Sequence, residues 1–321
     1  MEVMDIVVCT DKWFVMPTGV MMYSVCVNNP DVDIVFHIIV DESVTNDDKN
    51  DLNDIVVSFK GKGIVFYPIS ESIRNNHFPA LENTHISKAT YYRLWLTEIL
   101  PNSIDKVLYL DGDIIVRHSL LPLWNTDLAG YAVGVVTDWM EGCIELYHRL
   151  KYPSQYGYFN AGVLLINIKY WRENNVLKEF SDNLSNYYLN IKYHDQDILN
   201  VVFRDRKIVL PLKYNLSAGF LFKTPSYDYL KYKDEVTEAR MDPVILHFTT
   251  SEKPWHTYQR NPHPFQSSFY KYQNQTKWKG VKYEHRPFGL QIINFVADLF
   301  RKWGLKSQMN THEFIDIGPI D

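Results

Sequence analysis

The chain has 321 residues, of which 46% are hydrophobic and 15% aromatic, so it is long and apolar enough for a large globular core. Its net charge of -5, from 33 basic and 38 acidic residues, excludes a general attraction for nucleic acid. Three widely spaced cysteines without a CxxC pair, no secretory signal pattern and no run of 18 apolar residues predict a cytoplasmic protein without a disulfide framework or a thiolate zinc site.

The N-terminal third of the chain alternates between strand and helix patterns. Strands are predicted at Met4–Thr10, Val32–Val40 and Ile64–Tyr67, and helices at Val15–Val27 and Thr45–Phe59, the second of them capped by Thr45. This alternation is typical of an α/β protein with a mostly parallel central sheet and helices on both faces. The first turn, CTDKWF, contains neither GxGxxG nor a P-loop, so a dinucleotide-binding fold and a P-loop NTPase are not supported.

Two aspartates follow the next predicted strand. A helix is predicted from Ser87 to Leu100, then a short buried strand at Val107–Leu110, and Asp111, Gly112 and Asp113 come directly after it. Because strand side chains alternate between faces, the two carboxylates can point the same way. They would repel each other unless a cation lay between them, and a hard divalent metal is the natural partner. A plain turn after a strand gives the same letters, so the motif by itself leaves both interpretations open.

The second half of the chain continues the alternation and ends in a different composition. We predict strands at Tyr131–Thr137, Phe159–Ile168, Ile208–Leu210 and Val244–Phe248, and helices at Val176–Leu189 and Asp195–Phe203. From Trp278 onward basic and aromatic residues increase, and Pro287–Lys306 has an apolar helical face flanked by lysine and arginine. Such a helix suits a membrane surface, and docking on its own domain is the alternative.

Seven stretches, in this order, resemble bacterial family 8 glycosyltransferases: MDIVVCTD, ISKATYYRLWL, KVLYLDGDIIV, LPLWNTDL, YFNAGVLLINIKYW, HDQDILN and LHFTTSEKPWH. The similarity covers residues 4 to 260, roughly. The family contains retaining enzymes, among them lipopolysaccharide and lipooligosaccharide α-galactosyl- and glucosyltransferases. The resemblance implies a GT-A fold, a UDP-hexose donor, a manganese ion with magnesium as the alternative, and a glycan or glycolipid acceptor.

The resemblance also implies a division of the chain and roles for particular residues. Residues 1–263 would form the catalytic domain, and residues 264–321 a small helical appendage in which 278–306 contacts the inner face of the plasma membrane. The implied metal ligands are Asp111, Asp113 and His247, a mixed set that manganese accepts. Substrate contacts are implied at the uracil and ribose for Cys9, Thr10 and Asp11, and near the donor sugar for Arg93, Gly112, Asp138, Asn160, Ala161 and Gly162. Asp195 would bind sugar hydroxyls, with Gln196 beside the anomeric carbon. Lys253 would contact the diphosphate, and Thr250 the diphosphate or the acceptor edge.

The mechanism and the donor are left partly open. Retention of configuration ordinarily indicates a double displacement by a carboxylate nucleophile, which would be Asp138 or Asp195. The family position beside the anomeric carbon is Gln196, which favours front-face attack, with the acceptor hydroxyl entering on the side that UDP leaves. Galactose and glucose differ at one hydroxyl, and the motifs do not determine which is bound. The acceptor is expected to contact the loops Arg74–Asn83 and Glu141–Tyr158.

Two other classes of protein share part of the pattern. Phosphatases of the haloacid dehalogenase type also place a strand-terminal DxD at a metal, but they carry Thr or Val two residues later, where this chain has Ile115. A non-catalytic sugar-nucleotide-binding protein is the second alternative. The argument against it is the joint presence of Asp111, Asp113, His247, Lys253 and Gln196.

Overall fold

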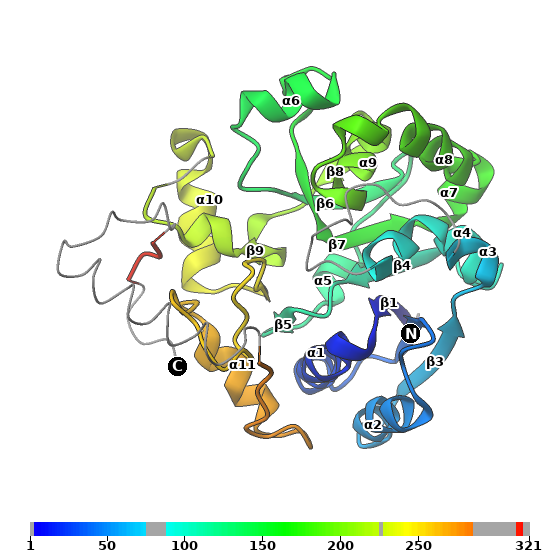
Figure 1. Cartoon of the computed structure of the whole chain (residues 1–321), viewed down its shortest axis with the longest axis vertical. Coiled ribbons are helices and arrows are strands. Elements are labelled where there is room, and N and C mark those ends of the chain that lie inside the picture. Colours follow the sequence, from blue (N-terminus) through cyan, green and yellow to red (C-terminus); the bar gives the residue numbers. More distant parts are fainter. Residues whose placement is uncertain (1–2, 75–87, 225–226, 285–312, 317–321) are drawn as a thin grey trace.

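The computed structural model describes residues 3–74, 88–224, 227–284 and 313–316 (Figure 1). Within these residues a seven-stranded sheet has the order β3-β2-β1-β4-β7-β6-β8, and a three-stranded sheet has the order β5-β10-β9. The strands are β1 (Met4–Thr10), β2 (Ile34–Val40), β3 (Lys62–Pro68), β4 (Lys106–Leu110), β5 (Ile114–Val116), β6 (Val133–Thr137), β7 (Phe159–Asn167), β8 (Lys207–Val209), β9 (Leu216–Ser217) and β10 (Ile245–His247).

The helices of the described residues lie between and around these strands. The α-helices are α1 (Val15–Asn28), α2 (Asn46–Val57), α3 (Glu71–Arg74), α4 (Leu96–Ile99), α5 (Leu121–Trp124), α6 (Ile144–Leu150), α7 (Ile168–Glu173), α8 (Val176–Asn186), α9 (His194–Phe203), α10 (Tyr229–Met241) and α11 (Gln266–Gln273). Short 3-10 helices are η1 (Lys12–Phe14), η2 (Lys88–Trp95), η3 (Ser154–Tyr156), η4 (Tyr188–Asn190), η5 (Leu212–Tyr214) and η6 (Ala218–Leu221).

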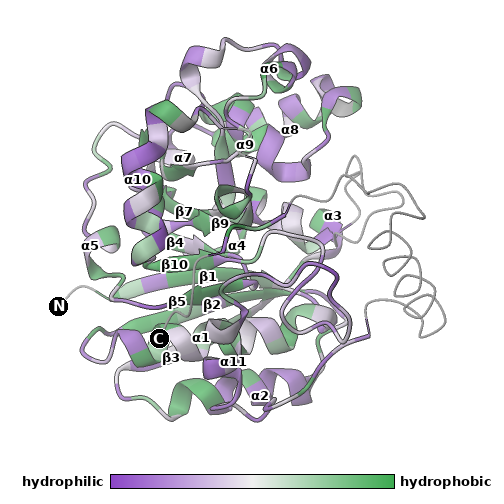
Figure 2. Ribbon diagram, turned by 90° about the vertical axis from the view of Figure 1, so that its left-hand side faces the viewer, coloured by the Kyte–Doolittle hydropathy of each residue, from purple (hydrophilic) through white to green (hydrophobic). Residues whose placement is uncertain are grey.

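The large sheet is mostly parallel, as its alternating pattern predicts. β1 pairs in parallel with β2 and β4, and β2 with β3, whereas β7 runs antiparallel to both β4 and β6. One face packs its apolar side chains against α1 and α2, and the other against η2, α4, α7, α8 and α9. Figure 2 shows the largely green central strands between these two layers of helices. The fold class predicted from the sequence is therefore confirmed.

One predicted helix is wrong. The segment expected to be α-helical from Ser87 to Leu100 is the 3-10 helix η2 over Lys88–Trp95, followed by the single α-turn α4, and position 87 lies outside the described residues. The Nε atom of Arg93 donates a hydrogen bond to the carbonyl of Thr90 at 3.0 Å. In an α-helix this carbonyl would accept from the backbone four residues later. The Arg93 guanidinium also donates to the Ala161 carbonyl at 2.6 Å, so η2 carries a side chain that is committed to a tertiary contact.

The described part of the C-terminal region packs on the body of the molecule. α11 lies beside α1 (Figure 1), and Asn28 donates a hydrogen bond to the Tyr272 hydroxyl at 2.9 Å. The segment 313–316 pairs with the end of η6 and the residues after it, because the Ile315 amide donates to the Leu221 carbonyl at 2.8 Å and the Lys223 amide donates to the Glu313 carbonyl at 2.8 Å. The predicted membrane-surface helix at 287–306 lies outside the described residues, and the division at residue 263 stays a prediction. No helix in the described ranges is long and apolar enough to cross a membrane.

Candidate active site

The two aspartates lie where the two sheets meet. The Asp111 amide donates to the Gly162 carbonyl at 2.9 Å, which extends the pairing of β4 with β7 by one residue. The Asp113 carbonyl accepts from the Phe248 amide at 3.0 Å, directly after β10. Since His247 is the last residue of β10, its imidazole is carried to the same junction. Backbone pairing thus brings together side chains that are far apart in the sequence.

The three side chains converge on one point. Nε2 of His247 lies 3.2 Å from Oδ1 of Asp113 and 3.7 Å from Oδ2 of Asp111. The three ligand atoms all lie within 4.8 Å of one another. The expectation that the two aspartates point the same way is confirmed. One imidazole nitrogen and a carboxylate oxygen from each aspartate form a donor set that fits a divalent cation.

Position 162 must be glycine for this arrangement to exist. A Cβ atom built on Gly162 would lie 2.1 Å from Cε1 of His247 and 2.8 Å from Oδ2 of Asp111. Both distances are shorter than any ordinary contact between such atoms. The resemblance placed Gly162 beside the donor sugar, and its position against two candidate metal ligands is an addition from the structure.

Lys253 holds the second aspartate in its charged form. Its Nζ donates to Oδ2 of Asp113 at 2.7 Å and to the Phe248 carbonyl at 2.6 Å. Burial by itself would raise the pKa of Asp113, but the charge of Lys253 and its hydrogen bond to the carboxylate outweigh burial and hold that pKa well below its ordinary value. The cluster therefore keeps a negative charge in a site that is largely shielded from water.

Arg93 lies between two carboxylates on the other side of the cluster. It is 3% exposed, and its guanidinium is 2.9 Å from Oδ1 of Asp111 and 2.9 Å from Oδ2 of Asp195. The Tyr109 hydroxyl also donates to Oδ1 of Asp111 at 2.9 Å, and the guanidinium carbon lies 4.2 Å from the centre of the Tyr109 ring. Two donors thus hold Oδ1, while Oδ2 faces His247. Tyr109 was not among the predicted site residues, although it lies two residues before Asp111 and can share a strand face with it.

Asp195 and its neighbours anchor the first turn of α9. The Thr90 hydroxyl donates to Oδ1 of Asp195 at 2.7 Å. Burial raises the pKa of Asp195 to about 6, against the opposing effect of the Arg93 charge. Asp195 is thus tied to Arg93 and, through it, to Asp111. Thr90 is a second residue that the sequence analysis did not single out.

Asp138, Asn160 and Gln196 form a buried polar group beside this network. Oδ2 of Asp138 accepts from Nδ2 of Asn160 at 3.0 Å and from Nε2 of Gln196 at 3.3 Å, and Oδ1 accepts from the Met140 amide at 2.9 Å. Oε1 of Gln196 accepts from the Ala161 amide at 3.0 Å. Burial raises the pKa of Asp138. Both carboxylate oxygens are therefore oriented by donors of the protein itself.

The residues predicted at the uracil and ribose lie at the end of β1. β1 and β4 are parallel neighbours, so Asp11 and Asp111 follow their strands at the same edge of the sheet. Oδ1 of Asp11 accepts from the backbone amides of residues 13 and 14 and caps η1. Oγ1 of Thr10 accepts from the Thr18 hydroxyl at 3.2 Å, and burial raises the pKa of the Cys9 thiol to about 12.

Gly112 and Thr250 occupy two further edges of the site. A Cβ at Gly112 would lie 2.7 Å from Oγ1 of Thr18, so glycine permits close packing against α1. The Thr250 hydroxyl donates to the Glu252 carbonyl at 2.8 Å within the turn that leads to Lys253. Of the two predicted acceptor loops, 141–158 contains α6 and is tied to α10 by an ion pair from Glu141 to Lys231 at 2.9 Å. Residues 75–83 of the other loop lie outside the described residues.

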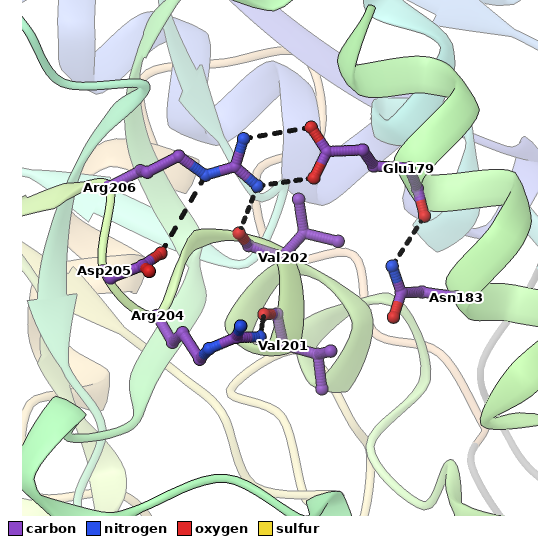
Figure 3. Close-up of a pocket in the computed structure, with 7 residues that line it drawn as sticks. All are labelled: Glu179, Asn183, Val201, Val202, Arg204, Asp205 and Arg206. Atoms are coloured by element: carbon purple, nitrogen blue, oxygen red, sulfur yellow. Dashed lines mark hydrogen bonds and ion pairs between the residues drawn. The ribbon is translucent and has the colours of Figure 1, made fainter.

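A separate pocket is lined by residues of α8, of the end of α9 and of the turn that follows α9 (Figure 3). Arg206 donates to both carboxylate oxygens of Glu179 in this pocket, at 3.0 and 2.6 Å, and Arg204 donates to the Val201 carbonyl at 2.9 Å. None of the predicted site residues lines it. The lining residues are Glu179, Asn183, Val201, Val202, Arg204, Asp205 and Arg206.

The chain is similar to known glycosyltransferases. The model of glycosyl transferase family 8 matches residues 5–259. A putative glycosyltransferase of Haemophilus influenzae is 33% identical over 257 residues, which cover 79% of this chain and 74% of that protein. The lipopolysaccharide glucosyltransferase WaaO of Escherichia coli is 28% identical over 287 residues, which cover 87% and 80%.

Solved structures agree with the family match. The galactosyltransferase LgtC, crystallised with donor and acceptor sugar analogues, has a TM-score of 0.75 at 30% identity, and the match covers 85% of this chain and 96% of that one. The chain therefore has the GT-A fold and belongs to glycosyl transferase family 8.

Proposed function

We propose that the protein is a retaining hexosyltransferase that moves galactose or glucose from a UDP-sugar to a hydroxyl of a glycan or glycolipid acceptor. The observation that carries this proposal is the convergence of Asp111, Asp113 and His247 within 4.8 Å, beside a second cluster formed by Arg93 and Asp195. Ligands for a metal and hydrogen-bonding groups for a sugar thus lie side by side. The similarity to galactosyl- and glucosyltransferases supports both donors.

Asp111, Asp113 and His247 would hold the metal, with Mn²⁺ favoured over Mg²⁺ because the set includes an imidazole. When bound, this ion supplies positive charge that stabilises the diphosphate as it leaves. Lys253 supplies a second positive charge, and its contact with Asp113 shows that its ammonium reaches the cluster. The residues Cys9, Thr10 and Asp11 are proposed to contact the uracil and ribose.

The donor sugar is proposed to lie between Arg93, Asp138, Asp195 and the backbone of residues 160–162. Gln196 lies within this group and is hydrogen-bonded on both sides of its amide, to the Ala161 amide and to Asp138. A neutral amide is a poor nucleophile, and the Asp138 carboxylate is already oriented by three donors. We therefore favour front-face attack. The bond from C1 to UDP breaks, the acceptor oxygen bonds to C1 on the same face, and a UDP oxygen takes its proton.

The acceptor is proposed to be a surface glycan of the lipopolysaccharide class. The names of the relatives support this class, since several are lipopolysaccharide glucosyl- or galactosyltransferases. A glycolipid acceptor would place the enzyme at the cytoplasmic face of the membrane. Residues 278–306 are the proposed contact, because Pro287–Lys306 combines an apolar face with flanking basic residues.

The first experiment measures UDP release from UDP-galactose and UDP-glucose without acceptor, in Mn²⁺ or in EDTA. We expect slow hydrolysis of one donor that requires Mn²⁺ and that Asp113→Asn abolishes. Asp182→Asn is the matched control, because Asp182 lies on the exposed side of α8 and pairs with Lys178. Metal-dependent UDP binding without turnover would favour a sugar-nucleotide-binding protein. Absence of metal-dependent UDP binding would overturn the proposal.

A further inference from the structure

A continuous chain of hydrogen bonds joins the candidate metal ligand His247 to the buried carboxylate of Asp138. Nδ1 of His247 lies 2.9 Å from Oδ1 of Asn215, and Nδ2 of Asn215 donates to Oδ1 of Asn160 at 2.9 Å. Nδ2 of Asn160 then donates to Oδ2 of Asp138 at 3.0 Å. Asn215 is 1% exposed and Asn160 is 7% exposed, so water does not compete for these bonds.

One backbone amide determines the direction of every bond in this chain. The Gly162 N–H can only donate, and it donates to Asn160 at 2.9 Å, so the atom it meets must be the amide oxygen Oδ1. The same oxygen also accepts a hydrogen bond from the atom of Asn215 that faces it, so that atom must be the amide nitrogen Nδ2. The other end of the Asn215 amide is then an oxygen, which can only accept. Nδ1 of His247 must consequently carry a proton.

We infer that Asn215 and Asn160 are positioning residues that set the tautomer of His247. With the proton on Nδ1, the neutral imidazole has its lone pair on Nε2, the atom that lies 3.2 Å from Asp113 and 3.7 Å from Asp111. The same two amides orient the carboxylate of Asp138, which also accepts from Gln196. The inference deepens the proposed function and rests on it, because it takes His247 as a metal ligand.

The arrangement explains why an asparagine is suited to position 215. A carbonyl or carboxylate oxygen that accepts from a ligating histidine fixes its ring and its tautomer, and loss of such a partner typically weakens metal binding about 10- to 100-fold. An aspartate would keep the acceptor for His247 but would place an oxygen against the oxygen of Asn160. A leucine of similar volume would remove both bonds. Comparison of the two substitutions therefore distinguishes the effect of the hydrogen bond to His247 from the effect of the hydrogen bond toward Asp138.

The test uses the full chain with ¹⁵N-labelled histidine, free of metal, at a pH at which imidazoles are neutral. NMR reports which ring nitrogen of His247 carries the proton, and His247→Gln assigns the signal. We expect the Nδ1–H form in the wild type and in Asn215→Asp, and a mixture of tautomers in Asn215→Leu. Electron paramagnetic resonance then follows Mn²⁺ binding, which we expect to weaken about 10- to 100-fold in Asn215→Leu and to persist in Asn215→Asp.

Asn29→Leu is the matched control for loss of a buried asparagine. Asn29 is also 1% exposed, and it accepts from the Leu120 amide at 2.7 Å and donates to the Val25 carbonyl at 2.9 Å. This variant should lose stability but keep the His247 tautomer and the Mn²⁺ affinity. A merely structural role of Asn215 would make Asn215→Leu behave like this control and would overturn the inference.

The remaining outcomes also decide the question. An Nε2–H tautomer of His247 in the wild type would overturn the inference. If Asn215→Leu does not fold, the same tautomer in Asn215→Asp would also overturn it. If the wild type shows the Nδ1–H form but binds no Mn²⁺, the proposed metal-dependent function fails, and the inference that two amides position a metal ligand fails with it. If Mn²⁺ binds with the other tautomer, only the inference fails. In Asn215→Asp we further expect UDP-sugar hydrolysis to fall with Mn²⁺ affinity retained.

Discussion

At the residue scale, the candidate metal cluster requires a glycine at position 162 as well as its three ligands. A methyl group at Gly162 would overlap the His247 ring and approach Oδ2 of Asp111. We expect Gly162→Ala to weaken Mn²⁺ binding by at least about tenfold, because both groups must move apart. Isothermal titration calorimetry of the folded Gly162→Ala variant with Mn²⁺ measures the affinity. Gly63→Ala is the control, since its new methyl would meet Val35 at an ordinary 3.6 Å, and equal affinities for the two variants would contradict the expectation.

Tyr109 supports a second prediction at this scale. Its hydroxyl and the Arg93 guanidinium together hold Oδ1 of Asp111, so that Oδ2 faces His247. Tyr109→Phe removes the hydroxyl and keeps the ring under the guanidinium. We expect a severalfold loss of Mn²⁺ affinity, corresponding to about 1 kcal/mol for one hydrogen bond. Tyr272→Phe, which removes a hydroxyl that bonds Asn28 far from the cluster, should leave Mn²⁺ affinity unchanged.

At the element scale, the capping of α2 is encoded locally. Oγ1 of Thr45 accepts from the Asp48 amide at 3.2 Å, and Oδ2 of Asp48 accepts from the Thr45 amide at 2.9 Å, which forms a reciprocal capping box. We expect Thr45→Ala to lower the free energy of unfolding by about 1 kcal/mol and Thr45→Ser to preserve most of it. Urea denaturation measures both. Equal losses in the two variants would show that the hydroxyl is not the stabilising group.

Local patterns also explain why α10 was not predicted and why η2 was predicted as an α-helix. α10 carries many charged residues, and its Leu230 and Met241 are exposed, so it has no regular apolar stripe to indicate a helix. In η2 the spacing is that of an α-helix, but the Thr90 and Arg93 side chains make tertiary hydrogen bonds to Asp195 and to the Ala161 carbonyl. Propensity predicts an element well only where packing agrees with it.

At the scale of the whole molecule, His263 joins parts of the chain that are distant in sequence. Its ring contacts Phe248 beside β10 and Phe314 of the C-terminal segment, at centroid distances of 4.7 and 5.3 Å, and its Nδ1 accepts from the Phe265 amide at 3.2 Å. Burial lowers the pKa of His263 from 6.5 to about 3, with a smaller contribution from the Lys253 charge. The folded protein therefore keeps this histidine neutral.

A pH-dependent stability follows from this burial. Between about pH 6.5 and pH 3 the unfolded chain binds a proton at His263 that the folded chain does not, so stability falls as the pH falls. Relative to His263→Gln, we expect the wild type to lose about 2 kcal/mol of unfolding free energy between neutral pH and about pH 5. Urea denaturation of both proteins across this range is the measurement. Parallel stability curves would contradict the prediction.

The sequence by itself determined the local order of strands and helices and the DxD pair. Apolar runs and helical spacing depend on neighbouring residues, so β1, β2, β4 and α2 were predictable, as was the shared direction of Asp111 and Asp113. The resemblance then identified the histidine and the lysine that follow β10. The C-terminal region shows the limit of such patterns, because an amphipathic stretch indicates an apolar face but not what covers it.

Only the tertiary structure decided which of these groups meet. β7 runs antiparallel between β4 and β6, and the pairing of β10 with β5 carries His247 to the aspartates. Asn215 gives no signal in the sequence, yet it contacts both His247 and Asn160. The physical reason is that hydrophobic periodicity indicates whether a side chain is buried. Which residue that side chain contacts depends on strand pairing and packing between segments that are distant in the chain.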